Sequence, residues 1–263
     1  MKLSVKLNDV FGPEVDARAM VRRAARAGAD AIGYRPWYGS DLDSVIETAA
    51  SEGVDVAYLS GGSEHVEGPE FPLTDPTAHD DAVAEISRAI DVAADADSEF
   101  LNVIPGRREE TLDPAVQHNA VVRALRDVVD RAERRGVTLL VEPVNTRVDH
   151  PGICLTSSYE GYEIVEAVDS PNLKLLYDVY HQQITEGNLI ANVRAHVDQI
   201  GHVHVGDVPG RHEPGTGEIN YPNVLAALAD AGYDGYVGCE FAPTGEPEEA
   251  IRAVGEMLAA SPS

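Results

Sequence analysis

Short apolar segments alternate with longer amphipathic segments along the chain. The apolar segments are rich in leucine or β-branched residues, and several are almost continuously apolar, which is typical of strands buried on both faces of a parallel sheet. Eight such segments are found, at residues 3–7, 29–35, 54–60, 99–105, 138–144, 173–180, 200–207 and 235–241. The pattern therefore predicts eight buried strands.

The segments between these strands carry apolar residues at about every third or fourth position, which predicts amphipathic helices. Gly28, Gly53 and Gly136 each follow one of these segments, as expected of a helix stop. The eight predicted helices cover residues 14–27, 42–52, 77–96, 114–135, 156–168, 183–198, 222–231 and 246–260.

The strict alternation of strand and helix predicts an α/β fold in which crossover helices join parallel strands. Eight such units in about 250 residues are typical of a (β/α)8 TIM barrel. An open doubly wound sheet is the alternative, but it usually has a glycine-rich phosphate loop after its first strand. The segment NDVFGPEV at that place has no GxGxxG pattern. No linker or repeat interrupts the chain, so we predict a single domain over residues 1–263.

The excess of acidic over basic residues excludes some classes of binding partner. The 263 residues include 45 acidic and 20 basic side chains, for a formal net charge of −25. A chain so acidic repels nucleic acid and anionic membrane surfaces, so we expect neither as a partner. Lys2, Lys6 and Lys174 are the only lysines. An acidic, lysine-poor surface suits concentrated salt, which screens self-repulsion. We interpret the chain as halophilic; the alternative is an ordinary acidic protein.

The cysteines and the first residues bear on the compartment. Cys154 and Cys239 each lie in an apolar stretch, where a cysteine is typically a small core residue, and two cysteines make no disulfide framework. The first residues lack the apolar core of a signal peptide, and no run of about 18 apolar residues is present. We therefore expect a cytoplasmic protein, and a homo-oligomer is compatible with the sequence.

Metal-binding side chains occur at the carboxyl ends of the last four predicted strands, where TIM barrels have their active sites. These residues are Glu142, Asp178, His204 and Glu240. Three carboxylates and one imidazole suit Mg²⁺ or Mn²⁺ better than a thiolate-loving metal. Burying three carboxylates together without a cation would be costly. The spacing therefore predicts one divalent metal site. His202 shares a strand face with His204, and we expect only one of the two to serve this site directly.

Two further residues are candidates for substrate binding. His181 follows Asp178 by three residues, and Arg211 lies in the loop 207–221, DVPGRHEPGTGEINY. Its three glycines and two prolines predict a shaped loop over the barrel mouth, where an arginine suits an anionic substrate. We expect Glu218 to tie down this loop or to cap the next helix. The loop 61–76 is also long, and long loops after barrel strands usually serve the site.

The segments VEPVNTR, LLYDVYHQQITEGNL, GHVHVGDVPGRHEPGTGEINY and GYVGCEF strongly resemble the hydroxypyruvate isomerase family of xylose-isomerase-like barrels. The match is dense from about residue 138 to about 245 and loose before it. The resemblance implies an aldose–ketose isomerase that converts hydroxypyruvate to 2-hydroxy-3-oxopropanoate (tartronate semialdehyde). It also implies Glu142 and Glu240 as the catalytic glutamates, and it implies metal ligation by Glu142, Asp178, His204 and Glu240.

Two segments depart from the pattern of that family. HVHVGD stands where bacterial members often have HIQIAD, so His204 replaces a glutamine; related ketose epimerases and other barrels of this type use histidine there. GYRPWYG at 33–39 stands where relatives often have a Glu-Phe pair, so Gly33 removes a possible carboxylate. The first departure strengthens the metal interpretation, and both leave the substrate less defined than the reaction class.

The expected reaction is a metal-assisted proton transfer through a cis-enediolate, with one glutamate as base and the other as acid. In it, His181 would bind a substrate oxygen and Arg211 the carboxylate of a sugar acid. A ketose 3-epimerase, or an isomerase of a longer sugar or sugar acid, is the first alternative. A trinuclear-zinc nuclease would need more histidine ligands and a basic groove. A non-catalytic sugar-acid-binding barrel would be expected to lack one of the two glutamates.

Overall fold

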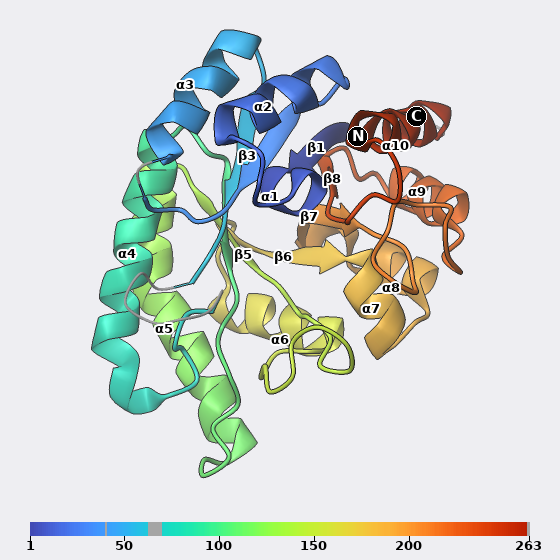
Figure 1. Ribbon diagram of the computed structural model, residues 1–263. Helices are drawn as coiled ribbons and strands as arrows, with labels where there is room; N and C mark the ends of the chain where they lie inside the picture. Colours follow the sequence, from blue (N-terminus) through green and yellow to red (C-terminus); the bar gives the residue numbers. More distant parts are fainter. Residues whose placement is uncertain (40, 63–69, 262–263) are drawn as a thin grey trace.

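Eight parallel strands form a closed barrel in this computed structural model, which describes residues 1–39, 41–62 and 70–261 (Figure 1). The strands pair in sequence order, and the last pairs with the first. They are β1 (Lys2–Lys6), β2 (Ala31–Tyr34), β3 (Asp55–Leu59), β4 (Phe100–Val103), β5 (Thr138–Val141), β6 (Leu173–Asp178), β7 (Ile200–Val205) and β8 (Tyr236–Cys239). All eight lie within the predicted segments except for Lys2 at the start of β1. The prediction of a (β/α)8 barrel is thus confirmed.

Helices surround the barrel and follow the strands in chain order (Figure 1). They are α1 (Leu7–Phe11), α2 (Ala17–Arg26), α3 (Leu42–Glu52), α4 (His79–Asp95), α5 (Pro114–Arg135), α6 (Ser158–Val168), α7 (Val179–Thr185), α8 (Leu189–His196), α9 (Tyr221–Asp230) and α10 (Pro247–Ala260). Short 3₁₀ turns at Pro76–Ala78 and Val197–Gln199 precede α4 and β7.

The predicted helix over 183–198 is wrong, because the chain forms α7 and α8 there as two separate helices. Between them, Gly187 and Asn188 both adopt positive φ, at 65° and 50°, which no helix continues through. The short helix α1 was also missed, because five residues are too few to show a helical period.

Two apolar clusters stabilise the barrel. The larger one lies between the strands and the helices, and the smaller one fills the interior of the barrel. The interior cluster consists of Ala31, Ala57, Tyr58, Phe100, Leu140, Leu176 and Tyr236. The His202 ring packs edge-on against Tyr58 and stacks on Tyr236, and its Nε2 lies 3.1 Å from the Ser4 hydroxyl. The interior of the barrel is therefore filled by packed side chains.

Tyr58 occupies the space beside Gly33. A Cβ atom at Gly33 would lie 2.2 Å from two atoms of the Tyr58 ring, so no larger residue fits there without movement of the ring. The glycine that removes a possible carboxylate from β2 thus makes room for an aromatic ring from β3.

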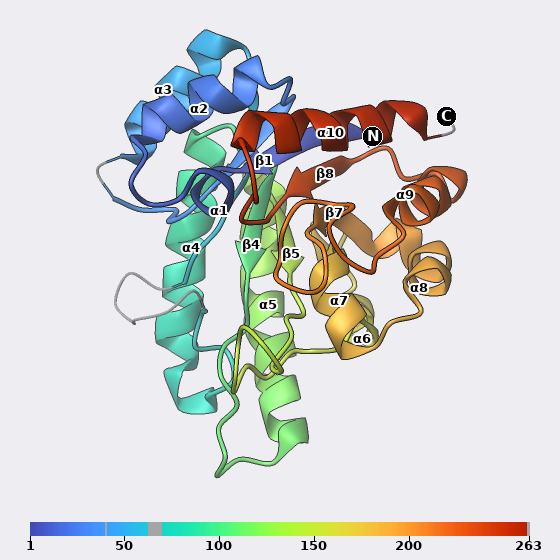
Figure 2. The same ribbon diagram turned by 45° about the vertical axis from the view of Figure 1, so that its right-hand side comes forward.

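The last helix packs against the first strand. Figure 2 shows α10 lying beside β1, and Arg23 of α2 pairs with Glu248 at the start of α10. This contact joins the end of the described chain to its beginning. Among the residues that the structure describes, no helix combines the length and the apolar character needed to cross a membrane.

Candidate active site

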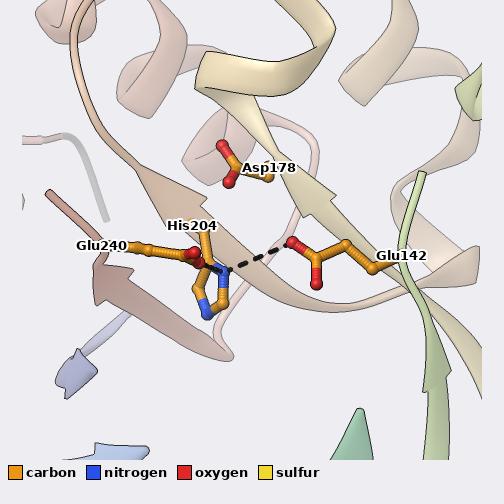
Figure 3. A group of neighbouring side chains, drawn as sticks. All are labelled: Glu142, Asp178, His204 and Glu240. Carbon is orange, nitrogen blue, oxygen red and sulfur yellow. Dashed lines mark ion pairs between the residues drawn. The ribbon is translucent and has the colours of Figure 1, made fainter. Parts of the chain in front are cut away.

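Glu142, Asp178, His204 and Glu240 come together at the barrel mouth, the end at which the carboxyl termini of the strands lie (Figure 3). One possible ligand atom from each residue lies within 4.8 Å of the others. All four side chains are buried, with at most 3% of any residue exposed. The structure thus gathers the four residues that the strand ends predicted.

The register of the barrel explains this convergence. Asp178 of β6 lies opposite His204 of β7, and His204 lies opposite Gly238 of β8. Glu240 follows Gly238 by two residues, so both face the same side of the sheet. A Cβ atom at Gly238 would lie 2.8 Å from atoms of the His202 and His204 rings. The glycine therefore leaves the space that His204 needs beside Glu240.

Two cations neutralise part of the charge in this cluster. The Lys6 ammonium lies 2.6 Å from Glu240 Oε1 and 3.5 Å from Asp9 Oδ2. Arg211 Nη2 lies 3.0 Å from Asp178 Oδ2 and 2.5 Å from Glu240 Oε1. Lys6 was not predicted as a site residue, although the rule that found the other four residues applies to it as well. Lys6 is a polar residue at the carboxyl end of a strand.

The two glutamates have opposite pKa shifts. Burial, reinforced by the negative charge of Glu240, raises the pKa of Glu142 to about 7. Burial also acts to raise the pKa of Glu240, but Arg211 and Lys6 outweigh it and hold that pKa well below the usual range. Burial raises the pKa of Asp178 against the opposing charge of Arg211. Near neutral pH, Glu142 is thus able to exchange a proton while Glu240 stays ionised.

The donor atoms of this cluster fit a divalent cation. Glu142 Oε2 accepts a hydrogen bond from Asn102 Nδ2 at 2.6 Å, and Glu142 Oε1 lies 3.9 Å from His204 Nδ1. His204 Nδ1 and Glu240 Oε2 are in close contact, yet neither atom has a hydrogen-bond partner among the described residues. Together with Asp178 they form a set of three carboxylates and one imidazole, which is the ligand chemistry of Mg²⁺ and related ions.

His181 lines the cavity at the mouth and is held in one orientation. The backbone N–H of Asn145 lies 3.2 Å from His181 Nδ1 and donates to it. Burial, together with the charge of Arg211, lowers the pKa of His181 well below its usual value, so the ring is neutral. Its proton is therefore on Nε2, which lies 3.6 Å from Asp178 Oδ2.

Arg211 is positioned by the loop 207–221. Asp207 is fully buried, and its backbone N–H donates to the His212 carbonyl at 2.7 Å. Its carboxylate accepts hydrogen bonds from the backbone N–H groups of Val208, Gly215, Gly217 and Ile219. Glu218 instead accepts a hydrogen bond from Gln183, and Asn220 caps α9. Asp207 thus ties down the loop from within, and Glu218 joins it to α7, in line with the expectation that Glu218 ties down this loop.

The cavity at the mouth is small, with a volume of 170 Å³. Its lining comprises Lys6, Asp9, Arg35, Ile104, Glu142, Val144, Asp149, His150, His181, Arg211 and Glu240. The loop 61–76 was expected to serve the site, but residues 63–69 lie outside the described part of the chain. None of its described residues lines this cavity. Drug-sized ligands need about 300–1,000 Å³, so this cavity suits a much smaller molecule.

Comparisons with known proteins agree with this fold. Residues 21–260 match the family described as xylose isomerase-like TIM barrel. The chain is 28% identical to the hydroxypyruvate isomerase of Escherichia coli over 253 residues, which are 96% of this chain and 97% of that protein. It is 37% identical to the 2-oxo-tetronate isomerase of Cupriavidus necator over 158 residues, or 60% of each chain. A crystal structure described as AP endonuclease, family 2, from Brucella melitensis has a TM-score of 0.86 and 27% identity. It covers 97% of this chain and 99% of that one.

Proposed function

The chain belongs to the xylose isomerase-like TIM barrel family, and we propose that it interconverts hydroxypyruvate and 2-hydroxy-3-oxopropanoate. Both relatives named above are isomerases of short oxo acids by their names. The observation that carries the proposal is the pair of buried glutamates, Glu142 and Glu240, beside one imidazole and two cations at the mouth of a small cavity. Such a pair is suited to moving a proton between neighbouring carbon atoms.

Glu142, Asp178, His204 and Glu240 would hold one Mg²⁺ or Mn²⁺ ion. The support is their burial, their mutual distances and the unpartnered atoms of His204 and Glu240. When bound, such an ion stabilises negative charge on oxygen atoms of the substrate.

The two glutamates carry the proton in this proposal. One takes a proton from the hydroxymethyl carbon of hydroxypyruvate, which leaves a cis-enediolate. The hydroxyl proton moves to the former ketone oxygen, and the other glutamate protonates the neighbouring carbon, which yields the aldehyde. Glu142 follows β5 and Glu240 follows β8, three strands apart in a ring of eight, so they approach the cavity from different sides. Acid–base groups placed in this way contribute about 10²–10⁴-fold to a rate.

His181 and Arg211 bind the substrate in this proposal. His181 donates from Nε2–H to a substrate oxygen, because its Nδ1 is already occupied by Asn145. Arg211 Nε has no hydrogen-bond partner among the described residues, so it can donate to a second oxygen. Its positive charge offsets the negative charge that develops on the enediolate.

Two observations disfavour the nuclease activity that the name of the Brucella protein suggests. Among the described residues, the cluster contains one imidazole rather than several. The net charge of −25 opposes the approach of a phosphate backbone.

Proton NMR of the purified protein in D2O at high salt tests the proposal. Hydroxypyruvate should convert to 2-hydroxy-3-oxopropanoate with deuterium at C2, in the presence of Mg²⁺ or Mn²⁺ and not after EDTA. 2-Oxo-tetronate, which is one carbon longer, serves as the second substrate, and D-psicose serves as the probe for epimerase activity. If the protein converted D-psicose but neither hydroxypyruvate nor 2-oxo-tetronate, that result would contradict the proposal.

A further inference from the structure

Three basic side chains line the cavity at the mouth, and they differ in what they contact. Lys6 pairs with Glu240 and Asp9, and Arg211 pairs with Asp178 and Glu240. The positive charge of these two residues therefore balances carboxylates of the protein itself. Arg35 is the third cation of the cavity, and it lies directly after β2, the strand that pairs with β1 beside Lys6.

The backbone of Arg35 is anchored, while its guanidinium group is left available. Its backbone N–H donates to Asn8 Oδ1 at 3.0 Å. Its Cγ lies near Gly61, at 3.6 Å from the position that a Cβ atom would take there, which is ordinary van der Waals contact. The guanidinium makes no hydrogen bond and no ion pair with any residue in the described ranges. Arg35 is half-buried, so part of its hydration is already lost.

The acidic groups that line the cavity contact other residues, and none of them is a described partner of the Arg35 guanidinium. Asp9 faces Lys6, Glu240 faces both Lys6 and Arg211, and Asp149 accepts a hydrogen bond from Asn145 Nδ2 at 2.8 Å. Glu142 accepts from Asn102. Among Lys6, Arg35 and Arg211, only Arg35 has no carboxylate partner among the described residues. An anion that enters the cavity can therefore pair with Arg35 without displacing a carboxylate of the protein.

We propose that Arg35 binds the carboxylate of the substrate and makes the site selective for short sugar acids over neutral sugars of the same length. Guanidinium and carboxylate form two parallel charge-assisted hydrogen bonds, which give both orientation and affinity. Arg211 then stays with Asp178, Glu240 and the reacting oxygens. The inference rests on the proposed function for the identity of the reaction, but the recognition of an acid does not depend on turnover.

Binding of D-glycerate tests the inference without catalysis. D-Glycerate keeps the carboxylate and the carbon chain of hydroxypyruvate, but it has no carbonyl group and does not isomerise. Calorimetric titration in Mg²⁺ and concentrated KCl should show a Kd raised by about tenfold or more in Arg35→Met, as expected when a charge-assisted hydrogen bond is lost. The Kd of Arg35→Lys for D-glycerate should lie between the values of Arg35→Met and the wild type. Arg18→Met, on the exposed face of α2, makes the same change in net charge and should bind as the wild type does.

Kinetics give a second readout. Arg35→Met should raise KM for hydroxypyruvate by about tenfold or more, while kcat/KM for dihydroxyacetone, in which a hydroxymethyl group replaces the carboxylate, stays unchanged. If the role of Arg35 were structural, the substitution would lower kcat/KM for both substrates alike. Arg35→Gln replaces Arg35→Met if circular dichroism shows that the methionine variant is unfolded.

The result that overturns the inference is unchanged D-glycerate affinity in Arg35→Met, or no D-glycerate binding by the wild type. Failure of the proposed function has a different signature. In that case the wild type does not isomerise hydroxypyruvate, but it still binds D-glycerate through Arg35.

Discussion

The two ends of the barrel differ in how their charged side chains are arranged. The far end, where the strands begin, has a cavity of 620 Å³ lined by Lys2, Glu99, Lys174 and other residues. The cavity at the mouth measures 170 Å³. Carboxylates, imidazoles and cations line the smaller cavity, and this convergence of ionisable groups, rather than volume, is why we propose the mouth as the reacting end.

Charged groups at the far end are dispersed. The Lys174 ammonium donates to the Asp198 carbonyl at 2.8 Å, and the Lys2 ammonium lies 5.0 Å above the Tyr236 ring. The hydroxyl of Tyr236 donates to Asp55 Oδ2 at 3.2 Å. These are separate contacts between pairs of groups, whereas Asp178 and Glu240 at the mouth each contact more than one basic side chain. This contrast is the reason why we propose the mouth, rather than the far end, as the place of the reaction.

The largest expected effect is on kcat, and it distinguishes glutamates at the mouth from a glutamate at the far end. Glu142→Gln and Glu240→Gln should each lower kcat by about 10²–10⁴-fold, because glutamine keeps the volume but does not accept a proton at neutral pH. Glu99→Gln, which makes the same change at the far end, should leave kcat unchanged. The double variant should be hardly worse than either single one, because groups that act as a unit are non-additive. If either single variant kept more than about a tenth of the wild-type kcat, that glutamate would not be a proton carrier.

The next effect concerns metal content. Asp178→Asn and His204→Ala should bind far less Mn²⁺ than the wild type in elemental analysis of the dialysed protein. Asparagine can still accept the hydrogen bond of 2.8 Å from the Tyr180 backbone N–H at the start of α7, so the helix cap survives this change. Asp198→Asn, at the far end, is the control. Wild-type stoichiometry in both mouth variants would place the metal elsewhere.

A smaller effect concerns the exposed charges outside both cavities. With a net charge of −25, the folded chain repels itself, and ions screen exposed charges more than buried ones. The melting temperature should therefore rise between dilute buffer and molar KCl, where the screening length falls to about 3 Å. NaCl at the same ionic strength should give a similar rise. An unchanged melting temperature would contradict the halophilic interpretation.

The smallest effect concerns one half-buried pair, Arg23 and Glu248. Arg23 donates to both carboxylate oxygens of Glu248, at 2.6 and 2.8 Å, and these hydrogen bonds lower the pKa of Glu248 to about 2. Because the folded pKa lies below the ordinary 4.5, the pair stabilises the fold above pH 4.5, and this contribution is lost as the pH falls through 2. Glu248→Gln should therefore cost up to about 1 kcal/mol in urea unfolding at pH 7.

The cost of Glu248→Gln should disappear near pH 2. Glu249→Gln, at the next position of α10, should cost little at either pH. A cost that is the same at pH 7 and pH 2 would show that packing, rather than charge, holds α10 on α2.

The pattern of the sequence was sufficient to predict the barrel and the end of it at which Glu142, Asp178, His204 and Glu240 meet. All eight strands were predicted, and the bounds of α3 and α5 agree with the prediction residue by residue. These elements are local, because apolar spacing and a glycine after the helix decide them. The break at Gly187 and Asn188 was missed, because the apolar period continues across it while the backbone does not.

For the candidate site, too, some features follow from the sequence and others from the tertiary structure alone. That Glu142, Asp178, His204 and Glu240 meet follows from their positions at the ends of parallel strands, because a closed barrel brings those ends together; that they bind a metal ion stays a prediction. The contacts of Lys6, Arg211 and Arg35 were decided by the tertiary structure. Lys6 reaches Glu240 across 234 residues of chain, and Asp207 positions Arg211 through hydrogen bonds to its loop. Whether a cation is neutralised or left available depends on which carboxylates fold beside it, and periodicity along the chain carries no information about such long-range neighbours.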